Sequence, residues 1–144
     1  MRYSIILSFL LILFFAGTTD MVAQTPQGNV VLMSNFERAF PENGSMAALD
    51  SLAKAVQTTV WDKNPLVISH KTVRHWWGND NRDFIEITVL KNWEDISKAM
   101  QKNDELFLAA WSTKAAQDNF NKAYNKYFSG KHSDEINQEV SPNK

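Results

Sequence analysis

A set of side chains able to contact or react with a small ligand lies between residues 70 and 86. It mixes imidazoles, indoles, carboxylates and a guanidinium: His70, Arg74, His75, Trp76, Trp77, Asp83 and Glu86. A concave site with apolar walls and a few polar groups has this composition. In such a site a His or Glu could abstract a proton, and an Arg or Trp N–H could stabilise the resulting anion.

The same residues also admit a purely structural interpretation. Aromatic side chains pair across hairpins for stability, and Arg74 could form a surface ion pair with Asp83 or Glu86 that contributes little. Trp76 and Trp77 are adjacent, so on a strand they face opposite sides, and at least one of them is then core or subunit contact. The sequence leaves both interpretations open and assigns no catalytic residue.

The histidines do not predict a metal site. His70 and His75 are five positions apart, which places them on opposite faces of a regular strand. His132 lies near Asp134 and Glu135, where a solvated segment past a helix end is the simpler explanation. We therefore predict no metal ligand.

Composition and motifs exclude several other classes. Lys plus Arg number 15 against 16 for Asp plus Glu, so the chain has no basic field for nucleic acid. It has no cysteine, which excludes thiolate catalysis, disulfides and a lipid-modified N-terminal Cys. No nucleophile-elbow, metalloprotease, phosphate-loop or dinucleotide-binding motif is present.

The elements that position the candidate residues begin with a hairpin. Residues 66–77 and 82–91 are rich in β-branched and aromatic types and flank a Gly/Asn/Asp break at residues 78–81, which predicts two antiparallel strands. Centring the loop on that break pairs His75 with Phe84 and Val73 with Glu86. In this register His70, Arg74 and Asp83 share the opposite face.

Strands and helices are also predicted on either side of the hairpin. Residues 29–36 predict a first strand, Ser45 is a plausible N-cap, and a stripe from Leu49 to Val60 predicts a helix ending near Trp61. A long helical segment follows the hairpin, with a bend at residues 103–104 and a C-terminal cap at Gly130. Residues 134–140 predict a short edge strand.

This order of elements predicts an α+β fold of the ferredoxin-like βαββαβ type. Its four-stranded antiparallel sheet carries helices on one face only. The other face must meet water or a second copy of the chain.

The N-terminus predicts an export signal. Residues 5–16 form an apolar run broken only by Ser8, shorter than the about 20 residues of a membrane span but suited to a signal peptide. We predict cleavage after Ala23 and a periplasmic or secreted protein, with an uncleaved N-terminal anchor as the alternative. The expected organisation is a signal peptide (1–23), a flexible lead-in (24–28), a single α+β domain (29–140) and a disordered tail (141–144).

Three segments carry a resemblance to a known family. Residues 73–83 (VRHWWGNDNRD), 89–96 (VLKNWEDI) and 131–136 (KHSDEI) resemble small exported members of the dimeric α/β-barrel (ferredoxin-like) superfamily, in an uncharacterised branch. The likeness spans residues 28–140. Its segments are a hairpin, a helix start and a terminal strand, and no catalytic set of the family can be matched residue by residue.

The resemblance implies a homodimer whose sheets pack face to face, with a cavity for a small apolar or aromatic ligand near the 66–91 hairpin. It offers an alternative, a cofactor-independent monooxygenase- or isomerase-like enzyme, and a structural or interaction protein without a cavity is a third possibility. No cofactor is predicted. Haem also occurs in the superfamily, and its only candidate axial ligands here would be His70, His75 and His132. No nucleic-acid partner is expected, and no membrane association after signal removal.

Overall fold

The computed structural model describes residues 28–75, 77 and 83–140. The predicted signal peptide, most of the lead-in, the hairpin break and the C-terminal tail lie outside these ranges, so those expectations stay predictions. Within the described ranges no helix has the length and apolar character that a membrane span requires.

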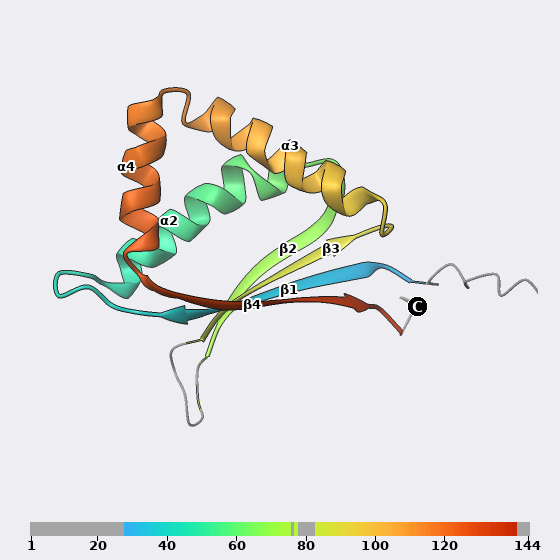
Figure 1. The fold of residues 1–144 in the computed structure, drawn as a ribbon, viewed down its shortest axis with the longest axis horizontal. Coiled ribbons are helices and arrows are strands. Elements are labelled where there is room, and N and C mark those ends of the chain that lie inside the picture. The colour runs from blue at the N-terminus through green and yellow to red at the C-terminus, as the bar shows by residue number, and fades with distance from the viewer. Residues whose placement is uncertain (1–27, 76, 78–82, 141–144) are drawn as a thin grey trace, which may run out of the picture.

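The described chain forms one antiparallel sheet and a layer of helices (Figure 1). The elements are β1 (Val30–Arg38), α2 (Met46–Thr59), the 3-10 turn η1 (Trp61–Lys63), β2 (Val67–Arg74), β3 (Asp83–Leu90), α3 (Asp95–Ala110), α4 (Lys114–Asn125) and β4 (Phe128–Gln138). The strand order is β2-β3-β1-β4. The predicted α+β ferredoxin-like fold is therefore confirmed.

All the helices lie on one side of the sheet (Figure 1). We call that side the inner face. It carries Phe84 of β3, which is buried in a cluster with Leu49 of α2 and Tyr127, and Phe36 of β1 packs against this cluster. Val30 and Leu90 form a second buried cluster with Ala99 of α3. We call the opposite side the outer face, and no described element covers it.

Helix α2 begins and ends as the sequence pattern predicts. The Ser45 hydroxyl accepts a hydrogen bond from the backbone N–H of Ala48 and caps the first turn. Leu49 and Val60 are the buried ends of its apolar stripe. The helix therefore presents one face to the sheet and leaves Asp50 and Lys54 exposed beside β2.

A buried amide pair joins the start of β2 to α3. The Asn64 side chain donates to the Ala99 carbonyl at 2.9 Å and to the Asn103 Oδ1 at 2.8 Å, and its own oxygen accepts from the Leu66 N–H. Asn103 therefore stays inside an unbroken α3, and the predicted bend at residues 103–104 is wrong. The break comes at residues 111–113, where the Thr113 hydroxyl caps α4.

The last strand is longer than predicted, and Gly130 is not a helix cap. Helix α4 ends at Asn125, and Gly130 lies inside β4 with φ +85°. The strand pairs with β1 along most of its length, with a register shift between Phe36 and Arg38. β4 is an edge strand, as expected from its alternating pattern.

The hairpin register differs by one residue from the expected one. Arg74, not His75, lies opposite Phe84, and Thr72, not Val73, lies opposite Glu86. Phe84 and Leu90 must face the helices, and in the observed register Arg74 reaches Asp50 of α2. A shift of one residue in register moves every side chain of β2 to the other face relative to β3. Arg74 and His70 therefore lie on the inner face together with Glu86, whereas the expected register placed them on the opposite face.

Candidate functional site

The strongest candidate site is a cleft between the helices and the inner face around Glu86. Glu86 lies in the middle of β3, between Thr72 of β2 and Ser34 of β1. The Tyr124 hydroxyl of α4 donates a hydrogen bond to its Oε1 at 3.3 Å. Burial raises the pKa of the Glu86 carboxyl, and the Tyr124 hydrogen bond opposes this rise only in part.

The phenol of Tyr124 is held in its neutral, donating form. Its pKa is raised by burial first and then by the neighbouring Glu86 charge. The pair therefore combines a carboxyl that takes up a proton more readily than usual with a phenol that keeps its own. Such a pair can exchange a proton with a bound molecule and donate a hydrogen bond to it.

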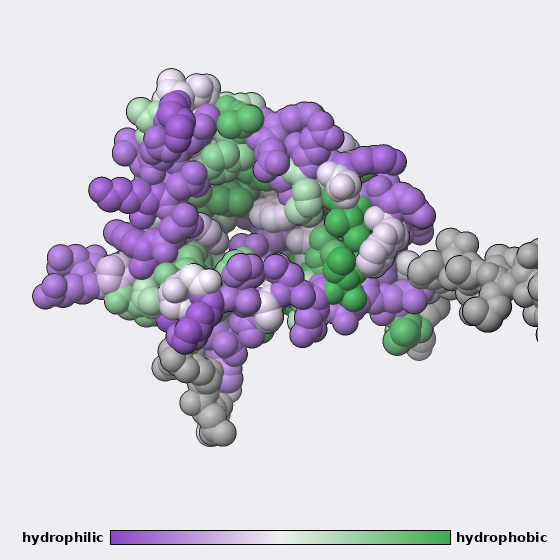
Figure 2. Space-filling view, viewed as in Figure 1, coloured by the Kyte–Doolittle hydropathy of each residue, from purple (hydrophilic) through white to green (hydrophobic). Residues whose placement is uncertain are grey.

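Aromatic rings form the walls of this cleft, which we call the Glu86 cleft. Phe128 packs against Phe36, Phe84 and Tyr124 with ring centroids 5.7, 5.2 and 5.1 Å away. The cleft has a volume of about 420 Å³ and is lined by Phe36, Glu86, Tyr124, Asn125, Phe128, Gly130, Lys131 and His132. Figure 2 shows the surface hollowed between the helix layer and the sheet.

His132 forms part of the rim of the Glu86 cleft. Its ring stacks on Phe36 with centroids 5.6 Å apart, and its Nε2 lies 3.4 Å from Asp134. The side chain is half exposed. This histidine therefore extends the aromatic wall to solvent and adds a polar group where a ligand would enter.

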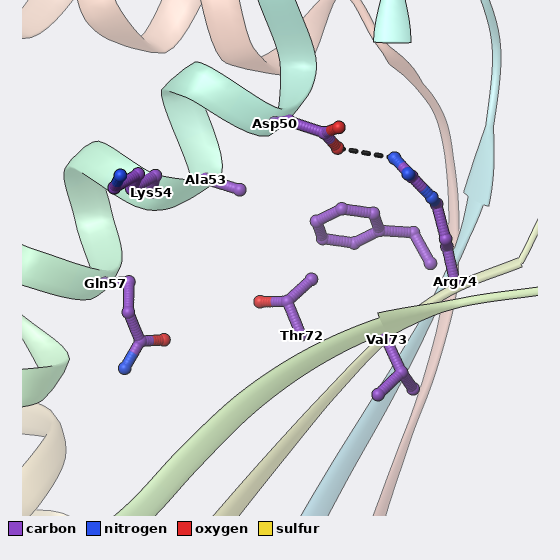
Figure 3. Close-up of a pocket in the computed structure, with 8 residues that line it drawn as sticks. Asp50, Ala53, Lys54, Gln57, Thr72, Val73 and Arg74 are labelled. Carbon is purple, nitrogen blue, oxygen red and sulfur yellow. Dashed lines mark hydrogen bonds and ion pairs between the residues drawn. The ribbon is translucent and has the colours of Figure 1, made fainter. Parts of the chain in front are cut away.

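A second hollow, the α2–β2 groove, holds Arg74. Its Nη1 donates to Asp50 Oδ1 at 2.6 Å across the gap between β2 and α2 (Figure 3). The groove measures about 460 Å³ and is lined by Asp50, Ala53, Lys54, Gln57, Thr72, Val73, Arg74 and Phe84. Arg74 and Glu86 thus share the inner face but line different hollows.

His70 lies on the inner face but lines neither hollow. Its ring stacks parallel on Trp61, with centroids 4.0 Å apart and an interplanar angle of 4°, and its Nδ1 lies 2.8 Å from Thr88 Oγ1. Burial lowers its pKa to about 4, against a smaller opposing effect of Asp62. A neutral imidazole packed in this way has a structural role.

The remaining candidates lie elsewhere. His75 and Asp83 are joined by a backbone hydrogen bond at the end of the hairpin, and strand alternation places them on the outer face. The His75 Nε2 is buried without a hydrogen-bond partner in the described part of the chain. Trp77 is 85% exposed, and Trp76 lies outside the described residues.

The described residues form no cluster of three or more His, Cys, Asp or Glu able to hold a metal ion. Haem does not fit the histidines either. His70 is packed between Trp61 and Thr88, His75 lies on the outer face, and the Nε2 of His132 is directed to Asp134.

Sequence reasoning named Glu86 but missed its partners. Tyr124 and Phe128 belonged to a helical stripe of aromatic residues typical of a core, and Phe36 to a strand predicted to be buried. Nothing in local spacing distinguishes a cleft wall from a core contact. Tyr124 lies 38 positions from Glu86, so only the fold brings the two together.

Comparisons with known proteins identify the fold alone. No family model matches the sequence, and no curated protein matches it. Among solved structures, a mutant of SnoaB from Streptomyces nogalater, a cofactor-independent oxygenase, matches with a TM-score of 0.50 and 11% identity. The match covers 78% of this chain and 94% of that one.

Two further structures agree on the fold. A protein from Caulobacter crescentus, provisionally described as an antibiotic biosynthesis monooxygenase, matches with a TM-score of 0.53 at 10% identity, over 81% of this chain and 94% of that one. A dimeric ferredoxin-like protein from an uncultured marine organism has a TM-score of 0.52 at 12% identity, over 80% and 90%. The chain thus has a ferredoxin-like fold, as these proteins do.

Proposed function

We propose that this protein binds a small aromatic or apolar molecule in the Glu86 cleft. The observation that carries the proposal is a partly buried carboxyl with a raised pKa that lines an aromatic-walled hollow of about 420 Å³. The rings supply contact area and orientation, and Glu86 and Tyr124 supply hydrogen bonds for one polar group.

We also propose that two copies pack their outer faces together. Met33 of β1 pairs with Ile87 of β3 at the middle of that face, beside Val31 and Val89, and all are partly buried with no covering element among the described residues. The Asn35 Oδ1 on the same face is buried without a partner in the described part of the chain. A similar fold is found in a dimeric protein.

The first experiment is a titration with 1-naphthol, a neutral aromatic with one hydroxyl. Ionised Glu86 would accept a charge-assisted hydrogen bond from this hydroxyl. We expect affinity to rise at least fivefold between pH 4 and pH 8 in the wild-type protein, measured by calorimetry. Backbone NMR shifts should concentrate at Phe36, Asn125 and His132.

Glu86→Gln should bind the probe with no pH dependence. Glu135→Gln is the matched control, because Glu135 is an exposed residue of β4 that lines neither hollow. A pH profile that survives in Glu86→Gln, or shifts confined to residues outside the cleft, would contradict the proposal.

A second candidate function is a cofactor-independent oxygenase or isomerase, favoured by the Glu86–Tyr124 pair and by the fold shared with SnoaB. Glu86 as carboxylate would take a proton from a carbon acid, and the Tyr124 hydroxyl would donate to the resulting anion. As an isomerase, Glu86 returns the proton at another carbon. As an oxygenase, a substrate CH2 reacts with dioxygen to give a carbonyl and water.

Proton abstraction can be measured before the substrate is known. We expect the protein to catalyse deuterium uptake from D2O into aryl ketones, and Glu86→Gln to slow this exchange at least a hundredfold. If the protein binds 1-naphthol but catalyses no deuterium exchange, the ligand-binding proposal stands and the enzymatic one is refuted.

A further inference from the structure

The α2–β2 groove is formed by a helix face that turns toward an edge strand without closing on it. Asp50, Ala53, Lys54 and Gln57 follow the i, i+3, i+4, i+7 spacing of one helical face. Opposite them, Thr72 and Arg74 point from β2 toward α2, whereas Val73 points away (Figure 3). Their side chains leave about 460 Å³ between the two elements.

The charged groups of the groove leave a cation in excess. Arg74 is paired with Asp50, with the two side chains 38% and 52% exposed. Lys54 also lines the groove, and its ammonium forms no ion pair among the described residues. Two cationic side chains therefore face one carboxylate, and a guanidinium that holds one oxygen through Nη1 retains further N–H donors.

The surroundings of Arg38 support this electrostatic interpretation. This buried guanidinium at the end of β1 has its pKa lowered, first by burial and then by the nearby charge of Arg74, against the carboxylates of Asp83 and Asp50. A second guanidinium close to Arg74 makes an incoming anion more favourable there. It also disfavours a cationic ligand.

The floor of the groove is apolar. Phe84 and Ala53 line it beneath the charged groups, and Phe84 belongs to the buried cluster of the inner face. We propose that the α2–β2 groove binds a small carboxylate with an apolar body, its carboxylate replacing Asp50 on Arg74 and reaching Lys54. This site is separate from the Glu86 cleft, since no residue lines both.

The test uses benzoate in calorimetry at low ionic strength, with backbone NMR to locate it. We expect saturable binding, with shifts at Ala53, Lys54 and Thr72, that weakens as salt is added. Arg74→Gln and Lys54→Gln should each weaken binding at least fivefold. Lys122→Gln, which removes an exposed helical lysine outside both hollows, should change it less than twofold.

Asp50→Asn distinguishes a ligand site from a structural ion pair. Removing the competing carboxylate should tighten benzoate binding at least threefold. If Arg74 serves only to hold α2 against β2, Asp50→Asn gives no gain, and that result overturns the proposal. Thermal unfolding of each variant checks that it is folded. If Arg74→Gln does not fold, the benzoate affinities of Lys54→Gln and Asp50→Asn still test whether the groove binds the carboxylate.

Two further probes define the ligand class. Benzamide, the neutral analogue, should cause no shifts at the groove residues Ala53, Lys54 and Thr72, and inorganic phosphate should bind there more weakly than benzoate because it gains nothing from Phe84. Phosphate binding as tightly as benzoate would overturn the assignment to an apolar carboxylate. Shifts at Phe36 and His132 in place of Ala53 and Thr72 would show that the anion binds in the Glu86 cleft, and would also refute the groove site.

Discussion

Two titratable residues on the inner face respond to burial in opposite senses. Burial raises the pKa of Glu86, so the folded state holds its proton more tightly than the unfolded chain and loses stability as pH rises. Burial lowers the pKa of His70 to about 4, so the unfolded chain takes up this proton first and stability is lost as pH falls. Glu86 lines a cleft whereas His70 does not, so only Glu86 is placed to use its proton on a ligand.

The His70 effect predicts an acid-sensitive fold. Between the ordinary histidine pKa of 6.5 and about 4, His70 should contribute a loss of about 2 kcal/mol in the free energy of unfolding, allowing for partial exposure. His70→Gln removes this titration. Urea unfolding at pH 7 and pH 4 should show a smaller loss in the variant than in the wild type.

His132→Gln is the control for this measurement, because His132 is half exposed at the rim of the cleft. It should leave the difference between pH 7 and pH 4 unchanged. Equal acid losses in wild type and His70→Gln would show that the stacked imidazole does not resist protonation.

At the level of elements, two glycines with positive φ lie at the beginnings of the paired strands β1 and β4. Gly28, with φ +127°, precedes β1, and a Cβ added there would lie 2.1 Å from the Glu139 carbonyl oxygen. Asn29 and Glu139 bond to each other beside it through backbone and side chains. Gly130, with φ +85°, has nothing within 4 Å of the same position.

Alanine at these glycines should therefore have unequal effects. Gly130→Ala is expected to cost about 1 kcal/mol of unfolding free energy from its backbone conformation alone. Gly28→Ala should cost about 2 kcal/mol or more, because the backbone must also move away from Glu139. Chemical denaturation of both variants measures the difference, and equal losses would rule out the close approach as the cause.

The sequence predicted which segments form helices and strands better than it predicted how these elements contact one another. The α2 stripe and its Ser45 cap are local signals, so the helix was predicted nearly to its bounds. The hairpin register was not, because it depends on how Phe84 and Arg74 meet α2 across the sheet. For the same reason Glu86 was recognised as a candidate while Tyr124, brought to it by the fold, was not.

At the scale of the whole molecule, the helices cover one face of the sheet and leave the other without a described cover. Partly buried apolar side chains on a free sheet face favour association with a second sheet. The proposed dimer would cover these apolar side chains and bring hydrogen-bonding groups of the second copy near the Asn35 Oδ1. Both hollows lie on the helix side, so association through the outer face leaves them open.

The proposed dimer predicts a molecular mass in solution and a single substitution that should abolish the association. Light scattering at micromolar concentration should give about twice the monomer mass. Ile87→Arg, at the middle of the outer face, should yield a folded monomer because a buried unpaired guanidinium opposes the contact. Leu108→Arg, which places the same charge on an exposed position of α3, should stay dimeric. A wild-type monomer at this concentration refutes the arrangement.

The β4 edge has a consequence for aggregation. Among the described strands β4 pairs only with β1, so its other side presents open backbone groups to any extended peptide. Its side chains after Phe128 are exposed and include Lys131, Asp134 and Glu135. Charged edge residues disfavour the addition of further strands. A protein with this edge should resist growth into fibrils, and replacing those charges with threonine or valine would remove its protection.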